Sequence, residues 1–147
     1  MTFELFQSAT YDLLIVRYPH DATLMDGTAS LTQFAATANN AGPKFIVVDC
    51  GAADASELSF RNVFGVAARK ALVFRELPRC RKLVLLVRNE LQFGFARMYQ
   101  TLLDERIDFE LEIACDEGTA IESVGLKHDS LETLIAEISV EDRHRLA

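Results

Sequence analysis

Several features that are common in proteins are missing from this sequence, and each absence excludes a class of protein. The three cysteines, Cys50, Cys80 and Cys115, form no Cys-x-x-Cys pair and are odd in number. This pattern argues against the disulfide framework of a secreted protein and favours a reducing compartment, in which free thiols are buried as small core residues. We therefore expect a cytoplasmic chain whose 147 residues fold as one domain without disulfides.

Long apolar runs are missing as well. The longest runs have about six residues, whereas a helix that crosses a membrane needs roughly twenty. The first residues include Glu4 and lack the basic start and the apolar stretch of a signal peptide. The sequence therefore predicts no membrane span and no secretion.

Positive charge is scarce, because 15 Lys and Arg residues stand against 22 Asp and Glu residues, for a net charge of −7. Such a balance disfavours nonspecific binding to nucleic acid or to anionic lipid surfaces. The stretch Arg69–Arg88 departs from this balance, since Glu76 is its only acid. Its cations form either a basic face or a solvated helix end that suits the C-terminal dipole.

Motifs that mark catalysis or metal binding are also missing. The sequence has no His-Glu-x-x-His, no Gly-x-Ser-x-Gly, no glycine-rich phosphate loop and no paired-carboxylate element. Cys50, Cys115 and His20 are the remaining candidates for metal ligands or for a nucleophile and its base, but no two of them lie at a motif spacing. We therefore expect no enzyme activity, no metal and no cofactor.

What the sequence does contain is a regular alternation of strand and helix patterns over residues 82–121. Leu83–Val87 is an unbroken apolar run, which is typical of a strand covered on both faces. Asn89 can cap the helix that follows, and Phe109–Ile113 then alternates between apolar and acidic residues, as a strand near a sheet edge does. Asp116 can cap the next helix. A strand, a crossover helix and a second strand predict a right-handed parallel unit.

The helix in this stretch has one apolar side and one polar side. Its predicted core side carries apolar residues spaced by three or four: Leu91, Phe95, Met98, Tyr99, Leu102 and Leu103. Its predicted solvent side carries Gln92, Arg97, Gln100, Asp104 and Glu105.

The first third of the chain predicts a hairpin followed by a helix and a strand. Phe3–Ser8 and Tyr11–Tyr18 are strand patterns with only two residues between them, so they should pair antiparallel. A helical stripe then runs from Leu24 to Ala38, and Lys44–Cys50 is a third interior strand.

The second helix is predicted to run from about Ala55 to Arg75, because Asp54 and Glu57 resemble a capping box. Its core stripe consists of Phe60, Val63, Phe64, Ala67, Ala71 and Phe74. Further apolar residues lie off this stripe: Leu58, Val66, Leu72 and Val73. The surplus indicates either a second packing surface, for a homodimer or a partner, or deeper burial within the monomer.

The end of the chain predicts a short helix, Glu117–Val124, which Gly125 breaks, and an extra amphipathic helix at about residues 129–139. Residues 140–147 are mostly charged, so we expect them to fray. The complete prediction is an α/β domain with a mixed, mostly parallel sheet, an antiparallel N-terminal hairpin and packed helices, with a core of about residues 3–124.

Two consecutive segments, LQFGFARMYQTLL and FELEIACDEGTAIESV, resemble the C-terminal half of the SpoIIAA-like proteins of bacteria, in the STAS/SEC14-like family. The distinctive residues are Phe93, Gly94, Ala96, Arg97, Met98 and Tyr99. The earlier segments VRYPHDATLMD and KFIVVDCGAAD agree with the family's early strands in spacing, so the resemblance covers residues 11–124. It implies a single STAS-like domain over residues 1–147, with helices packed against the sheet.

The resemblance also implies a role. In the anti-sigma factor antagonists of that superfamily, a partner kinase phosphorylates a serine at the start of the helix after the third strand, and the surrounding surface binds this partner. The corresponding stretch here, DASELSF, holds Asp54, Ser56 and Ser59, although it lacks the antagonists' Asp-Ser-Ser-Gly-Leu pattern. Ser56 and Ser59 are therefore candidate phosphorylation sites, and the alternative for both is helix capping or a solvated hydroxyl.

Sheet topology suggests another place for a site, because ligands of open parallel sheets bind at the carboxyl ends of the strands. That rule gathers His20, Cys50, Asp54, Ser56, Arg88, Asn89, Cys115 and Asp116 on one edge. Arg97 and Tyr99 are further candidates from the family helix. Arg97 suits an anion or an ion pair with Asp104 or Glu105, and the Tyr99 hydroxyl either reaches a pocket or packs in the core.

These observations lead to two functional hypotheses. The first is a noncatalytic STAS-like regulatory or protein-interaction module, whose contact surface at Asp54–Phe64 serves a homodimer or a kinase or anti-sigma-like partner. The alternative is a small-ligand or lipid-binding protein with a pocket at the carboxyl edge of the sheet or under the phenylalanine-rich helices.

Overall fold

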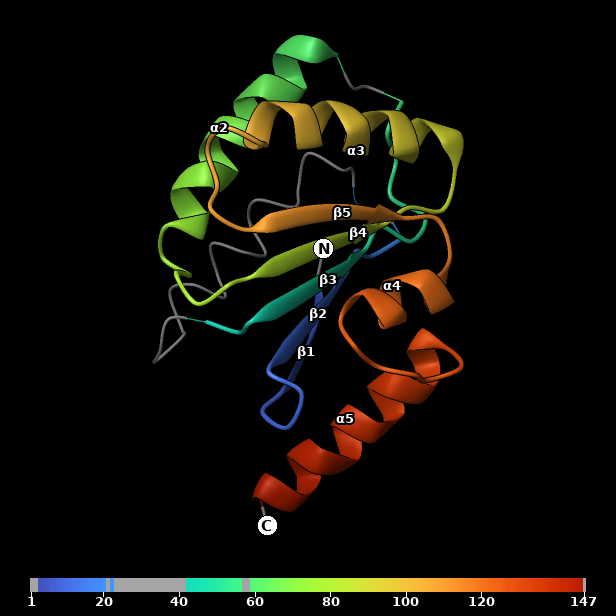
Figure 1. Cartoon of the computed structure of the whole chain (residues 1–147). Coiled ribbons are helices and arrows are strands. Elements are labelled where there is room, and N and C mark those ends of the chain that lie inside the picture. The colour runs from blue at the N-terminus through green and yellow to red at the C-terminus, as the bar shows by residue number, and fades with distance from the viewer. Residues whose placement is uncertain (1–2, 21, 23–41, 57–58, 147) are drawn as a thin grey trace.

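The computed structural model of the chain describes residues 3–20, 22, 42–56 and 59–146. In this part, five strands form one mixed sheet in the order β1-β2-β3-β4-β5 (Figure 1). β1 (Glu4–Ser8) pairs antiparallel with β2 (Leu13–Arg17), and β3 (Phe45–Asp49), β4 (Lys82–Leu86) and β5 (Glu110–Ala114) follow in parallel. The predicted α/β class, with its N-terminal hairpin and mostly parallel sheet, is confirmed.

Four helices of the described part cover the two faces of this sheet. α2 (Phe60–Phe74) and α3 (Glu90–Leu103) pack on one face, and α4 (Glu117–Ser123) and α5 (Leu131–Leu146) pack on the other (Figure 1). α5 continues past the predicted end at residue 139. The predicted helix at Leu24–Ala38 lies outside the described residues. No helix within the described ranges is both long and apolar enough to cross a bilayer.

The unbroken apolar runs of the central strands supply both layers of core. Leu14, Ile46 and Leu83 are buried against α2 and α3, while Leu13 and Val47 are buried against α4 and α5. Successive strand residues point to opposite faces, so a strand covered on both sides needs apolar residues at every position.

α5 lies under the N-terminal hairpin and holds it with polar contacts over a large sequence separation. Tyr11 Oη donates a hydrogen bond to Glu137 Oε1 at 2.6 Å, and the guanidinium of Arg17 bonds Glu132 Oε1 at 2.6 Å. The helix therefore joins the last described part of the chain to the first edge of the sheet.

The predicted helix caps Asn89 and Asp116 are confirmed. Asn89 Oδ1 accepts the N–H of Gln92 at 2.9 Å, and Asp116 Oδ1 accepts the N–H of Thr119 at 2.8 Å. Each side chain therefore satisfies a backbone donor that its helix leaves unpaired.

The predicted capping box at the start of the second helix is wrong. α2 begins at Phe60, and the Oγ atom of Ser59 accepts the N–H of Asn62 at 3.3 Å. Asp54 instead accepts the N–H of Ser56 at 2.9 Å, and its own N–H donates to the carbonyl of Ala22 at 3.0 Å. This contact with a distant segment holds Asp54 outside the helix.

The apolar surplus of α2 is only partly buried. Val66 is fully buried and Val73 packs at the border of the core, so part of the surplus is absorbed within the monomer. Phe64, which was predicted to face the core, is 44% exposed, and Leu72 is exposed as well. Leu58 lies outside the described residues.

Candidate functional site

Asp54, Ser56 and Ser59 lie together in the loop between β3 and α2, and all three are exposed. Hydrogen bonds from the backbone N–H of Ser56, and then from its side chain, hold the pKa of Asp54 below its usual value. The Asp54 carboxylate is therefore ionised at neutral pH and lies directly against Ser56. Ser59 is free of this carboxylate contact and serves as the N-cap of α2.

Arg97 and Tyr99 point to opposite sides of α3 and do not join the serine loop. Arg97 is exposed, and its Nη1 lies 3.5 Å from Gln100 Oε1. It does not form the predicted ion pair with Asp104 or Glu105. Tyr99 is 0% exposed, and its ring stacks on Phe95 with 5.6 Å between the ring centroids. Its hydroxyl has no hydrogen-bond partner in the described part of the chain. Tyr99 therefore packs in the core, which is one of the two roles predicted for it.

The carboxyl edge of the sheet is occupied by an ionic network centred on Asp49. This residue is 4% exposed, and its two carboxylate oxygens accept bonds from Arg88 Nε at 3.1 Å and Arg88 Nη2 at 3.0 Å. Arg17 Nε lies 3.8 Å from the same carboxylate, and the N–H of Gly51 donates to it at 2.9 Å. Arg88 also bonds Glu117 at 3.0 Å. Hydrogen bonding to Asp49 raises the pKa of Arg88 above its usual value.

Gln92 extends this network into the protein interior. It is fully buried, and its Nε2 donates to the carbonyls of Gly51 and Ala53, both at 3.0 Å. Its Oε1 accepts the N–H of Arg88 at 2.7 Å, so the side chain ties the turn after β3 to the turn after β4.

The predicted orientation of the first turn of α3 is thus wrong. Gln92 was assigned to solvent and Leu91 to the core, yet Leu91 is 64% exposed. The hydrogen bonds of Gln92 offset the cost of burying its amide. A leucine at this position would leave the carbonyls of Gly51 and Ala53 and the N–H of Arg88 without these partners. The spacing of Asn89 and Gln92, three residues apart as in a capping box, was the sequence signal for this role.

The remaining residues assigned to the carboxyl edge do not assemble around a shared centre. Cys50 is buried, and burial raises the pKa of its thiol to about 12, so the thiol stays protonated at neutral pH and is a poor nucleophile. Cys115 and His20 are exposed. Within the ranges that the structure describes, no three His, Cys, Asp or Glu side chains are grouped to hold a metal ion.

Lys70 is a buried cation within the stretch Arg69–Arg88, for which the sequence predicts either a basic face or a solvated helix end. It is 3% exposed, and its Nζ lies 4.7 Å from the centroid of the Tyr99 ring. It has no carboxylate partner among the described residues, and desolvation lowers its pKa to about 8. Its position was visible in the sequence, because Lys70 lies three residues after Ala67 and four before Phe74, on the core stripe of the helix.

Comparison with known proteins adds no family to this geometry. No protein-family model matches the chain, and neither the curated proteins nor the solved structures give a match. A function must therefore be inferred from the residues and their arrangement.

Proposed function

We propose that the chain is a noncatalytic STAS-like regulatory module of bacterial type, which binds another protein through the stretch Asp54–Phe64. The observation that carries this proposal is the joint exposure of Ser56, Ser59 and Phe64 along the β3–α2 loop and the first turns of α2. A large exposed aromatic side chain and two exposed serines within one short stretch offer a partner both apolar contact area and a group that can be modified.

Ser59 is the better of the two candidate phosphorylation sites. A phosphate on Ser59 would lie at the N-terminus of the 15-residue helix α2, where the helix dipole and the free N–H groups favour negative charge. A phosphate on Ser56 would lie against the ionised carboxylate of Asp54, which repels it. Modification of Ser59 would thus change the charge of the contact surface and leave α2 intact.

The exposed apolar residues of α2 also support a homodimer. Phe64 and Leu72 are both large, and both are exposed on this helix. A second copy that packs against α2 would cover them, and burial of such area favours association.

Light scattering coupled to size-exclusion chromatography tests the homodimer. We expect the wild-type chain to have about twice the 16.4 kDa mass of the monomer, and Phe64→Glu to return it to the monomer mass. Leu91→Glu is the matched control, since Leu91 is an exposed apolar residue on α3. A wild-type monomer at every concentration, or an equal effect of the control, would reject the homodimer.

A photo-crosslinking residue at position 64 tests for a different protein partner, with position 91 as the control. A discrete crosslinked product from position 64 alone supports the contact surface, and equal products from both positions reject it.

Measurement of the intact mass of chain isolated from its native cells tests the proposed phosphorylation. The phosphate should be lost in Ser59→Ala and kept in Ser56→Ala, and the reverse result would move the site to Ser56.

A further inference from the structure

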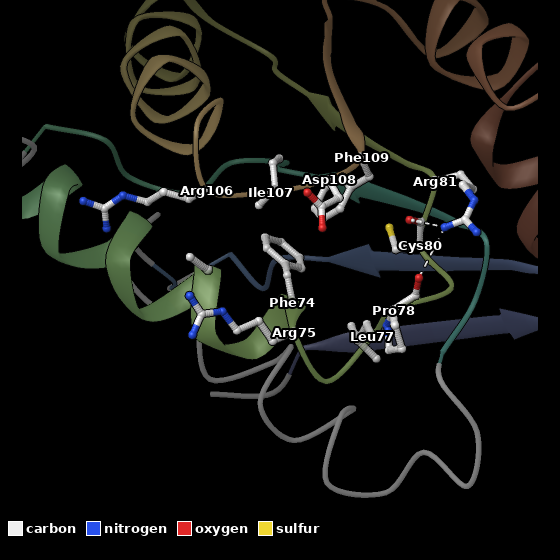
Figure 2. A pocket seen from close by; sticks show the side chains of 11 residues that line it. Phe74, Arg75, Leu77, Pro78, Cys80, Arg81, Arg106, Ile107, Asp108 and Phe109 are labelled. Atoms are coloured by element: carbon white, nitrogen blue, oxygen red, sulfur yellow. Dashed lines mark hydrogen bonds between the residues drawn. The ribbon is translucent and has the colours of Figure 1, made fainter.

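A cavity of about 240 Å³ lies at the amino end of the sheet, between the end of α2, the turn that leads to β4, and the link from α3 to β5 (Figure 2). Part of its wall is apolar. The rings of Phe74 and Phe109 meet edge to face with centroids 4.9 Å apart, and Leu77 and Ile107 extend this surface. Such a surface suits a small apolar body, such as an aromatic ring.

Three arginines line the same cavity, and no carboxylate within the described part of the chain pairs with any of them. The guanidinium of Arg106 lies over the exposed ring of Phe64 at 5.1 Å. Arg81 Nη1 donates to two backbone carbonyls at 3.3 and 3.4 Å, and Arg75 is exposed. Figure 2 shows the side chains of Arg75 and Arg106 on one side of the cavity and that of Arg81 on the opposite side.

Among the described residues Arg61, Arg69 and Arg97 also form no salt bridge, so the feature that sets the three lining arginines apart is that they share one cavity in a chain of net charge −7. Arg17, Arg79 and Arg88 each have a carboxylate partner within 3.0 Å. The cavity therefore carries a net positive lining of three arginines against one acid, Asp108, and such a concave region concentrates anions. Guanidinium groups suit carboxylates, sulfonates and phosphates in particular.

The charge and the size of the cavity narrow the class of ligand. Asp108 also lines it, so the local charge is moderate and favours a group of one or two negative charges over a polyphosphate. A volume of about 240 Å³ lies below the range of about 300–1,000 Å³ that is usual for drug-sized ligands, so the occupant must be small. Burial raises the pKa of the Cys80 thiol to about 11, so this lining residue is a neutral group.

We propose that this cavity is a binding site for a small amphipathic anion, with an apolar body against Phe74 and Phe109 and an acidic group held by Arg75 and Arg106. The site lies away from the carboxyl edge, but it adjoins the proposed protein contact at Asp54–Phe64, because Arg106 lies over the ring of Phe64.

Naphthalene-2-sulfonate is a suitable probe, followed through the backbone amide signals of the 16.4 kDa chain in two-dimensional NMR. We expect saturable shifts confined to residues 71–81 and 106–109. Uncharged 2-naphthol and inorganic phosphate should each bind about tenfold more weakly than the sulfonate. The first lacks the acidic group, and the second lacks the apolar body. Shifts elsewhere, no binding of the sulfonate, or equal binding of 2-naphthol would overturn the proposal.

Charge removal tests the role of the arginines. The double variant Arg75→Gln/Arg106→Gln should raise the Kd of the sulfonate about tenfold, and the Kd of 2-naphthol should stay the same. Arg61→Gln is the matched control, since Arg61 is exposed on α2 and does not line the cavity. Equal Kd values for the double variant and the wild type would overturn the proposal, and so would an equal loss in the control.

Discussion

Two groups of arginines at opposite ends of the sheet differ in how they are compensated, and a further arginine at the amino end, Arg79, pairs with Asp12. At the carboxyl end, Arg17 and Arg88 converge on the buried carboxylate of Asp49. At the amino end, Arg75, Arg81 and Arg106 line a cavity without a carboxylate partner among the described residues. Topology favours the carboxyl end as a ligand site, but an arginine that already makes charge-assisted bonds within the protein is less available to a ligand. By this measure, the arginines around the cavity are more available to an anion than those at Asp49.

The largest effect in this comparison should come from Asp49→Ala. This change leaves Arg88 and the N–H of Gly51 without their acceptor in a buried place, so we expect a loss of about 3 kcal/mol in the free energy of unfolding. Urea denaturation measures it. Asp108→Ala at the amino end is the control and should change stability by less than about 0.5 kcal/mol. Similar losses in both variants would remove the distinction between the two ends.

Lys70 combines features of both groups of arginines. It is buried like the carboxylate network at Asp49, and it has no carboxylate partner among the described residues, like the arginines of the cavity. Its ordinary pKa of 10.5 falls to about 8 in the folded chain, which corresponds to about 3 kcal/mol of cost when both states are protonated. Lys70→Met should therefore stabilise the protein at pH 7, by up to about 2 kcal/mol after loss of the contact with the Tyr99 ring.

The difference in the free energy of unfolding between Lys70→Met and the wild type should shrink as the pH rises. Below pH 8 the full cost is present, and between pH 8 and 10.5 the folded state has released the proton while the unfolded state still holds it. The stability of the wild type should thus rise towards that of Lys70→Met across this window. Cys50, whose pKa is raised to about 12, acts in the opposite direction above pH 9, but it is present in both proteins. A difference that stays constant from pH 7 to 10 would show that Lys70 is not desolvated.

Gln92→Leu should destabilise the chain by about 2 kcal/mol, because the carbonyls of Gly51 and Ala53 and the N–H of Arg88 would lose their partner. Thermal unfolding is a sufficient measurement. Leu91→Gln, the neighbouring swap in the opposite sense, should have almost no effect because Leu91 is exposed. If the two substitutions cost the same, the orientation of this turn would be wrong.

The smallest effect should be that of Arg75→Gln on stability. An exposed arginine without an ion pair contributes little, so we expect a change of less than about 0.5 kcal/mol. Arg88→Gln is the comparison at the carboxyl end and should cost more, because it breaks the buried pair with Asp49. Parallel denaturation curves check both, and a larger loss for Arg75→Gln would contradict the assignment of its charge to ligand binding.

Much of the fold could be predicted from local periodicity. The strand patterns at Leu83–Val87 and Phe109–Ile113 and the caps Asn89 and Asp116 depend on residues within a few positions of each other, and the structure confirms them. The misplaced start of α2 has a non-local cause, because the N–H of Asp54 bonds Ala22, 32 positions earlier in the chain.

The polar residues of the core were harder to place. Gln92 and Lys70 lie on the core stripes of their helices, but a polar or charged side chain is usually predicted to face solvent. Their burial is explained by the groups that they contact in the folded chain. The cavity was not predictable for a related reason. Arg75 belongs to the basic stretch that the sequence shows, but Arg106 and Phe109 reach the same place from the far end of α3, after two further elements of the fold.

The late position of α5 in the chain has a consequence for biosynthesis. A ribosome delivers Leu13 and Ile15 well before the two helices on their face of the sheet, since α4 begins at Glu117 and α5 at Leu131. This face of the nascent sheet therefore waits longer for its helices than the face beneath α2, and exposed apolar strands at this stage invite aggregation. A holding chaperone would therefore find this face open for longer during synthesis than the face beneath α2.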